Sequence, residues 1–497
     1  MAKEKTGGAG RSISSNFLYS SLTTVLTIVA PLVTYPYVSR VLGPENMGRL
    51  GVASSFSNYF IVAAGLGFAT YGVRAVAAAR SEGGPGFNKK ATELIILAIA
   101  ADVIATVGYF AAIALVPRYR SDIGLFAIFG LTVIAVPLGI DWFFKGIEEF
   151  RYIGLRNTAL QPIFIVLLFI LVRTRSDAPR YALLFVASSV AGMLLNVYTA
   201  RRFVRLDFRG IKPAGHLGPM LIYALMSFAI TGYTNFDFLF LGLVSSTREA
   251  GYYSIGIRLA RMSTTVAATL SGVLLPRLSS LVGRDEGEYR RILKNSFSAI
   301  LLFAIPAAVG LAVTSDDLAF AFGGRAFAAS AVSVRICALV VPIVSVTNFL
   351  QMQLFIPRQR ERQLLLSFVL ALAVTGAAMA LLVRPLGQEG AAWGMVLGEG
   401  SVLAALVLFA GRTELRDIFG LSRLWKYFAG AAACGAAAFA PRLILAGGFV
   451  RLGLSIAAGI LAYAIALLAL RDATALLIVG KILGRFSAPR ERAGDGR

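Results

Sequence analysis

Apolar stretches of about 20 residues recur from one end of this chain to the other, and they restrict its fold more than any other feature. A helix rises about 1.5 Å per residue, so such a stretch is long enough to cross a hydrocarbon core roughly 30 Å thick. Inside that core every backbone N–H and C=O group needs an internal partner, which leaves helices and closed barrels as the spanning structures. The length of the stretches favours helices. We therefore predict an all-α fold, a polytopic membrane protein.

The stretches and the polar segments between them give the expected organisation. We predict about 14 transmembrane helices in two six-helix lobes plus a C-terminal helix pair. About two thirds of the 48 Lys and Arg residues fall in segments on one side, which predicts that both termini are cytoplasmic. The expected parts are an N-terminal lobe at 1–204, a cytoplasmic linker at 205–216, a C-terminal lobe at 217–412, the extra helix pair at 413–471 and a cytoplasmic tail at 472–497.

One hairpin occurs twice in the chain. An offset of 203 residues superimposes Gly48 on Gly251 and Arg74 on Arg277. Each copy is an apolar span, a short polar turn and a second span that ends in the arginine. Two similar lobes in a membrane predict a transporter whose site lies between them.

Several classes of site are excluded by residue counts. The net charge of +22 lies mostly in segments that flank spans, so it predicts contact with membrane lipids and not with nucleic acid. We expect neither a metal site nor a disulfide framework, because the chain has one histidine, His216, and two cysteines, Cys337 and Cys434. The chain has no phosphate-binding loop of the ATPase type. We expect no cofactor, no metal and no catalytic residue: a transporter and not an enzyme.

Arg258 and Arg261 are the strongest candidates for function, because they lie in the middle of an expected span. Residues three apart share one helix face. An arginine at the centre of a span costs about 2.5–3.5 kcal/mol on insertion scales, so it needs water, a partner or a ligand. A cationic wall of a substrate cavity is the favoured interpretation, since the guanidinium fork matches phosphate oxygens. A buried structural ion pair is the alternative.

Neighbouring polar residues complete the expected cavity. Asp237 falls at the depth of Arg258 in the second hairpin, and we predict either an ion pair between them or uptake of a cation by the carboxylate. Asn235 belongs to the same span. In the first hairpin, Ser55 and Asn58 correspond to the two arginines, and they are expected to offer neutral hydrogen bonds.

Other charged residues in or near spans have less specific interpretations. Arg74 and Arg277 are either positive-inside anchors or a symmetric pair at the cytoplasmic mouth. Asp102 and Glu399 are candidates for ion coupling, because burial favours the neutral form of a carboxyl group. Asp141 is expected at the inner membrane interface, and Asp316-Asp317 is interpreted as solvated charge.

Several motifs resemble those of a known family. They are Asn16-Phe-Leu-Tyr, Tyr35-Pro-Tyr-Val-Ser-Arg40, Gly65-Leu-Gly67 followed by Arg74, and Glu249-Ala-Gly251-Tyr-Tyr-Ser254. This pattern, over roughly residues 14–415, resembles the bacterial polysaccharide flippases of the Wzx type. That group belongs to the multidrug/oligosaccharidyl-lipid/polysaccharide exporter superfamily.

The resemblance implies a fold, a substrate and a location. The fold is two lobes around a central cavity lined by spans one, two, seven and eight. The substrate is an oligosaccharide on undecaprenyl diphosphate, moved by alternating access from the cytoplasmic to the periplasmic leaflet of a bacterial inner membrane. The implied partners are this lipid-linked oligosaccharide, membrane lipids and other polysaccharide-assembly proteins, and a monomer is expected. In longer flippases a C-terminal helix pair can form a groove for the lipid tail.

Two other functions remain open. A multidrug or cation antiporter of the same fold would require acidic residues in the cavity, whereas this chain is expected to place arginines there. A membrane-embedded glycan polymerase or ligase would require a long outer loop with catalytic residues, and no expected loop exceeds about 20 residues.

Overall fold

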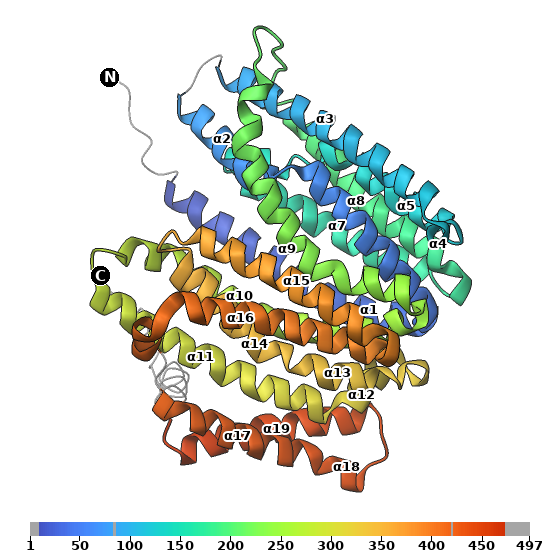
Figure 1. Ribbon diagram of the computed structural model, residues 1–497, viewed down its shortest axis with the longest axis vertical. Helices are drawn as coiled ribbons and strands as arrows, with labels where there is room; N and C mark the ends of the chain where they lie inside the picture. The colour runs from blue at the N-terminus through green and yellow to red at the C-terminus, as the bar shows by residue number, and fades with distance from the viewer. Residues whose placement is uncertain (1–8, 83–85, 419–420, 473–497) are drawn as a thin grey trace, which may run out of the picture. The chain divides into compact units, whose positions relative to one another are not determined.

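The computed structural model describes residues 9–82, 86–418 and 421–472, and they fold as helices and connecting turns (Figure 1). Within these residues, 12 helical segments are long and apolar enough to cross a membrane. The predicted class, an all-α polytopic membrane protein, is confirmed. The predicted cytoplasmic tail lies outside the described residues apart from Asp472.

Internal packing divides the chain into two compact units. The first comprises the residues up to Ile255 together with Phe322–Ala328 and Ala371–Gly394. Helix α1 is its centre and packs against α3, α5, α7 and α9. The helices that lie wholly in this unit are α1 (Ala9–Gly65), α2 (Phe68–Glu82), α3 (Gly86–Leu115), α4 (Pro117–Arg120), α5 (Ile123–Ile134), α6 (Asp141–Gly146), α7 (Phe150–Leu171), α8 (Ala178–Ala200) and α9 (Leu217–Val244).

The second unit comprises Gly256–Ala321, Ala329–Leu370 and the residues from Met395 onward. Most boundaries between these two units fall within helices and not at a linker. The predicted division into two six-helix lobes joined by a linker therefore stays a prediction. The remaining helices are α10 (Thr247–Leu281), α11 (Glu286–Val313), α12 (Ser315–Gly323), α13 (Ser330–Ala338), α14 (Val340–Phe349), α15 (Glu361–Leu386), α16 (Gln388–Ile418), α17 (Leu421–Phe439), α18 (Pro441–Ile444) and α19 (Phe449–Ala469).

The two copies of the repeated hairpin break at corresponding positions. In the first copy the break is inside α1, at Gly43, whose φ of 77° is a left-handed value that favours glycine. The second copy breaks between α9 and α10, at Ser245 and Ser246. Helix α10 is not one of the 12 apolar segments, because its arginine, serine and threonine residues lower its hydropathy.

The two glycines of the repeat lie in one reciprocal contact inside the first unit. A Cβ on Gly48 would lie 1.6 Å from the carbonyl oxygen of Thr247, and a Cβ on Gly251 would lie 1.8 Å from that of Pro44. Pro44 and Thr247 are themselves related by the 203-residue offset. Each copy thus presents the same residue pair to the other, as in a contact with two-fold symmetry. Only glycine permits so close an approach of two helix backbones.

The segment between α8 and α9 is bound to α3 by side-chain hydrogen bonds. The backbone N–H of Asp207 donates to Thr92 Oγ1 at 2.9 Å, and that of Lys212 donates to Glu93 Oε1 at 2.7 Å. Glu93 Oε2 lies 3.0 Å from His216 Nε2, and the Tyr71 hydroxyl lies 2.6 Å from His216 Nδ1. The single histidine of the chain therefore helps to fix the start of α9.

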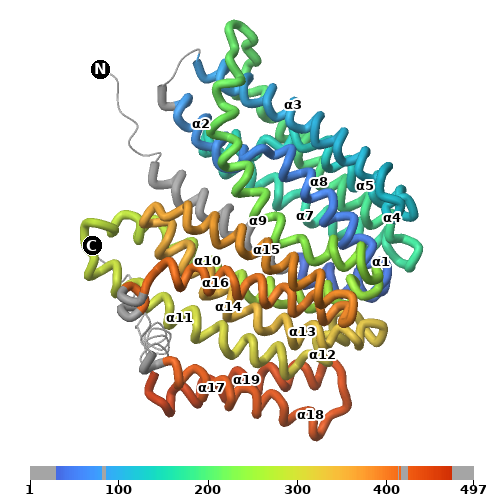
Figure 2. Tube along the Cα trace, in the orientation of Figure 1, coloured from blue at the N-terminus to red at the C-terminus, as the bar shows by residue number. Residues whose placement is uncertain are grey.

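In the second unit, α17 and α19 form a helical hairpin beside α11 (Figure 2). The Tyr463 hydroxyl of α19 donates to the carbonyl of Leu302 in α11 at 2.8 Å. At the α18 end, Arg451 binds the fully buried Asp317 through Nη2 at 2.6 Å, and Arg442 donates to Asp316 at 3.0 Å. The interpretation of this acidic pair as solvated charge is wrong for Asp317, because arginines that follow it by more than 100 residues cover it.

Candidate functional site

The polar residues predicted for the first hairpin lie on α1. Ser55 is buried and Asn58 is half-buried. Between them, Ser57 lies 3.0 Å from the Tyr109 hydroxyl, which donates to the carbonyl of Phe126 at 2.6 Å. This part of α1 is therefore fixed to α3 and α5 by buried hydrogen bonds.

Asp237 is fully buried on α9 and has a strong partner within the first unit. The Tyr253 hydroxyl donates to its Oδ2 at 2.7 Å, and the backbone N–H of Phe238 donates to Oδ1 at 2.8 Å. Asn235 is half-buried and donates to the carbonyl of Thr231 at 3.3 Å. The pairing of Asp237 with Arg258 stays a prediction. Sequence reasoning missed the tyrosine, although it lies 16 residues from Asp237 across the same turn.

Arg258 and Arg261 are both exposed on the second unit's part of α10. Most residues around them on this helix are buried, so the two side chains share one accessible face. One turn further on, the hydroxyl of Thr265 donates to the carbonyl of Arg261 at 3.0 Å.

Arg74 and Arg277, the pair predicted for the cytoplasmic mouth, are exposed but differ in their partners. Arg74 Nη1 donates to the Tyr223 hydroxyl at 2.7 Å and lies over that ring, with Cζ 5.8 Å from its centroid. Arg277 Nη2 donates to Glu288 Oε1 at 2.5 Å. The equivalent arginine thus contacts a tyrosine in the first copy of the repeat and a carboxylate in the second.

Asp102 and Glu399, the candidates for ion coupling, are both buried in apolar helices, α3 and α16. Within the described part of the chain, Oδ1 of Asp102 has no hydrogen-bond partner. A buried carboxylate oxygen without a partner is energetically costly in its charged form. This makes Asp102 a better candidate for proton uptake than a carboxylate held by arginine.

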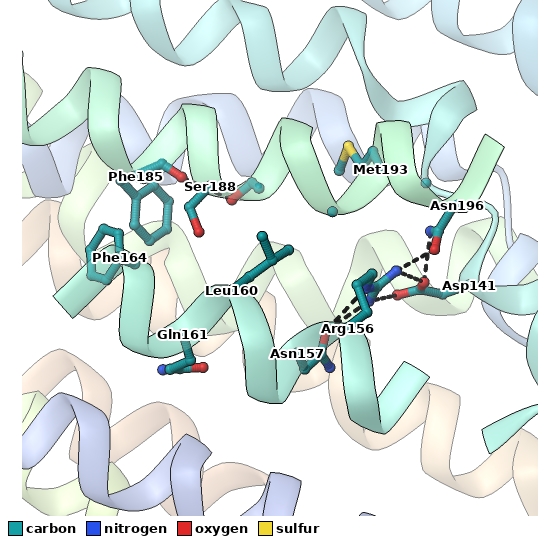
Figure 3. A pocket seen from close by; sticks show the side chains of 13 residues that line it. Asp141, Arg156, Asn157, Leu160, Gln161, Phe164, Phe185, Ser188, Met193 and Asn196 are labelled. Carbon is teal, nitrogen blue, oxygen red and sulfur yellow. Dashed lines mark hydrogen bonds and ion pairs between the residues drawn. The ribbon is translucent and has the colours of Figure 1, made fainter. Parts of the chain in front are cut away.

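A polar pocket of about 380 Å³ lies between α6, α7 and α8 of the first unit (Figure 3). At one end, Arg156 donates from Nη1 to Asp141 Oδ1 at 2.7 Å, and Asn196 Nδ2 donates to the same oxygen at 2.8 Å. Arg156 also donates to the side-chain oxygens of Asn157 and Asn196. Leu160 and Met193 line the middle, and Phe164, Phe185 and Ser188 lie at the other end (Figure 3).

A smaller hollow of about 290 Å³ adjoins this pocket. The two share Gly139, Asp141 and Met193 in their linings. The smaller hollow is also lined by Gly65 and Gly67, at the α1–α2 junction, and by Ser227 of α9 among others. Asp141 therefore stands where the polar pocket meets a space bounded by α1, α2 and α9.

Sequence reasoning missed this site. Asp141 was expected only at an interface, and Arg156 counted only as one of the basic residues that set orientation. The available signal was helical spacing of polar residues: Asn157 and Gln161 are four apart on α7, and Ser189 and Asn196 are seven apart on α8. Polar residues at such spacing inside an apolar span indicate a face that lipid does not cover.

Comparisons with known proteins agree on family and fold. Residues 13–282 match the model of a family described as "Polysaccharide biosynthesis protein". The "Putative O-antigen transporter" of Escherichia coli (strain K12) is 22% identical over 419 residues, which cover 81% of this chain and 98% of that protein.

Two solved structures show the same fold. A lipid II flippase MurJ in an inward closed conformation has a TM-score of 0.74 at 13% identity, with 94% of this chain and 100% of that chain covered. An inward-facing multidrug resistance MATE family transporter of the MOP superfamily has a TM-score of 0.58 at 15% identity, with 83% and 99% covered.

Proposed function

The chain belongs to the polysaccharide biosynthesis protein family, and from this we propose that it is a flippase for a lipid-linked oligosaccharide. In this proposal the substrate is an oligosaccharide on undecaprenyl diphosphate. It moves from the cytoplasmic to the periplasmic leaflet of a bacterial inner membrane, for surface polysaccharide synthesis, by alternating access. The similarity to a named O-antigen transporter over 98% of that protein supports the substrate class.

The observation that carries the proposal is the exposed arginine pair on α10. Arg258 and Arg261 lie on a helix otherwise rich in apolar residues, and both side chains are accessible. Charged groups at such positions are tolerated where they face water or a ligand. Two guanidinium groups spaced one turn apart suit the two phosphates of a diphosphate, because each can donate a bidentate pair of hydrogen bonds.

Polar groups of the first unit suit the sugar part of the substrate. A head group with many hydroxyls cannot enter hydrocarbon, because each unpaired hydroxyl or charge costs several kcal/mol. Asn58 and Asn235, which are half-buried, would supply partners along a hydrated path, while the lipid tail stays in the bilayer. Ser55 and Asp237 are buried, so they would join this path only in a conformation that exposes them. Asp102 and Glu399 are the proposed sites of ion coupling. We propose a monomer that works alongside other polysaccharide-assembly proteins.

The cation antiporter is the weaker alternative. A cationic drug needs an acidic wall, and the exposed charged pair on α10 is basic. The multidrug transporters of similar structure support the fold alone, at 15% identity.

Substitution of the arginines tests the proposal. Arg258→Ala and Arg261→Ala should each lower transport roughly 10-fold or more, the effect of losing a charge-assisted hydrogen bond, with unchanged abundance in the membrane. The measurement is the fraction of lipid-linked precursor that is accessible at the periplasmic face of spheroplasts. The matched control is Arg291→Ala, an exposed arginine at the start of α11.

Three results bear on the outcome. Deletion of the gene in a host without a second flippase should leave precursor in the cytoplasmic leaflet, and a normal periplasmic pool would refute the function. If the alanine variants lose abundance while activity per molecule persists, the arginines are structural. Arg261→Lys keeps charge but not the fork, so an intermediate rate is expected.

A further inference from the structure

The proposed function leaves the polar pocket between α6, α7 and α8 without a role. We infer that it is a subsite for neutral sugar residues of the head group, an inference that rests on the proposed function. The pocket lies in the first unit and has a volume of about 380 Å³. Its lining combines amides, hydroxyls and aromatic rings. That volume lies within the range of roughly 300–1,000 Å³ typical of small-molecule sites.

The hydrogen bonds of Arg156 argue against an anionic ligand. Its guanidinium group has five N–H donors. Nε donates to Asn157, Nη1 to Asp141 and Asn196, and Nη2 to Asp141 and Asn157. No donor remains for a phosphate. The side chain of Arg156 is only 8% exposed, whereas that of Asp141 is 42% exposed, so the group that the pocket presents is a carboxylate.

A carboxylate held by arginine is a strong acceptor for hydroxyl groups. An ionised carboxylate has about four lone-pair sites, and the protein donors take only part of this capacity. Three protein donors occupy three of these sites, so a sugar hydroxyl can donate to the remaining one, and the bond is charge-assisted. A diphosphate at the same place would be repelled by the carboxylate.

The far end of the pocket offers neutral groups without protein partners. Gln161 and Ser188 make no hydrogen bond to other described residues, although both line the pocket. Phe164 and Phe185 stand at the same end (Figure 3). Free amide and hydroxyl groups beside aromatic rings suit a pyranose, which has polar edges and apolar faces.

Part of the exposed apolar surface of α7 and α8 lies on the helix faces opposite the pocket. Leu155 and Val166 of α7 are exposed, and they lie nine residues from Phe164 and Asn157 respectively. Nine residues are two and a half helical turns, so the exposed leucine and valine are on the opposite face. Leu194 on α8 has the same relation to Phe185. The pocket itself extends to the exposed ring of Phe185, so it is open at that end.

The pocket shares lining residues with a hollow that is bounded by helices of the proposed path. The adjoining hollow shares Asp141 with it and is bounded by α1, α2 and α9. Two of these helices, α1 and α9, carry Ser55, Asn58 and Asn235, which the proposed function places along the path. A sugar that reaches Asp141 from the hollow would continue toward Gln161.

A binding experiment separates the sugar subsite from the diphosphate site. The protein in lipid nanodiscs is titrated with undecaprenyl diphosphate and with the lipid-linked oligosaccharide extracted from a host that lacks the flippase. The test variant is Gln161→Leu/Ser188→Ala. The control is Tyr198→Phe, which removes a hydroxyl from an exposed residue of α8 outside the pocket. Ser188→Thr keeps the hydroxyl and should behave as the wild type does.

The expected result is a preference for the glycosylated lipid in the wild type and the control. The double variant should reduce this preference roughly 10-fold, as the loss of two hydrogen bonds would give, and keep the affinity for the bare lipid. The part of the preference that Asp141 contributes should remain.

Every other result overturns the inference. A wild type with no preference for the glycosylated lipid, or a double variant that keeps the preference, shows that the pocket does not bind sugar. Equal losses for both lipids with a lower Tm indicate a structural role. If the wild type binds neither lipid, the proposed function fails first, and the inference fails with it. Arg261→Ala should weaken binding of both lipids when the proposed function is right, whereas loss of the sugar subsite alone lowers only the affinity for the glycosylated lipid.

Discussion

At the scale of single residues, the salt bridge between Arg156 and Asp141 joins three helices. Arg156 comes from α7, Asp141 from the start of α6, and Asn196 from near the end of α8. The guanidinium group is almost fully buried, and all five of its donors are used. Removing Asp141 would leave the buried guanidinium group of Arg156 unpaired, and removing Arg156 would leave the partly exposed carboxylate of Asp141 unpaired. Either change costs more than the net stability of the pair.

Arg156→Ala should therefore lower the free energy of unfolding by about 1–3 kcal/mol, discounted from the fully buried case because Asp141 is partly exposed. The double variant Arg156→Ala/Asp141→Ala should recover part of that loss, since no unpaired charge remains. The measurement is a double-mutant cycle on Tm in detergent. Additive losses would show that the two residues do not stabilise each other.

Asp102 differs from Asp141, which is held by Arg156, because its buried Oδ1 has no hydrogen-bond partner within the described part of the chain. Asp102→Asn should leave Tm unchanged or higher, because the variant has no charge to desolvate. If Asp102 takes up the coupling proton, the same variant should lose the response of transport to an imposed proton gradient. The measurement is flipping in proteoliposomes with and without that gradient. A fall in Tm with normal coupling would assign Asp102 a structural role.

At the scale of elements, the contact between the two repeat copies depends on backbone approach and not on side chains. The helix that follows Gly43 in α1 and the first turns of α10 meet at Gly48 and Gly251. Each glycine has a backbone carbonyl oxygen less than 2 Å from where a Cβ would be. A backbone oxygen cannot rotate away as a side chain can, so a larger residue must separate the helices.

Gly251→Ala should destabilise the protein by about 1–3 kcal/mol or more, the usual cost of overpacking. Gly272→Ala is the matched control on α10, because no atom lies within 4 Å of the position that its Cβ would take. The control should be neutral or stabilising by up to about 1 kcal/mol, since alanine favours helix. Tm of the purified variants checks both. Equal behaviour of the two variants would contradict the close approach.

At the scale of the whole molecule, hydropathy and the repeat predicted the spans well. Helix α9 is one of the apolar spans, and the polar turn expected in the second hairpin falls at the break that separates α9 from α10. These features follow from local composition, which the sequence displays directly. The candidate residues on α10 were also expected on one face, and both are accessible.

Contacts between distant segments could not be predicted in the same way. Arg451 reaches Asp317 across 134 residues, and Arg156 reaches Asn196 across 40. Nothing in the local pattern of either arginine distinguishes a buried pair from a basic residue near a span end. The break in α1 without a full loop is another case, because Gly43 alone produces it. Such features depend on how the helices pack against one another, and a hydropathy pattern carries no information about that packing.

The orientation in the membrane is the last property that the sequence predicts, through the excess of basic residues on one side. Helix α10 has 35 residues and a length of about 50 Å, which is enough to cross a core roughly 30 Å thick, so we predict that its two ends lie on opposite sides. Ser246 and Ser280 are exposed near these ends, and Cys337 and Cys434 are buried. In intact cells, an impermeant maleimide should label Ser246→Cys and should label Ser280→Cys only after permeabilisation. The unsubstituted protein, with its buried thiols, should stay unlabelled. The reverse pattern would put Arg277 and Lys294 on the periplasmic side, so the leaflet from which the proposed substrate enters would have to be exchanged.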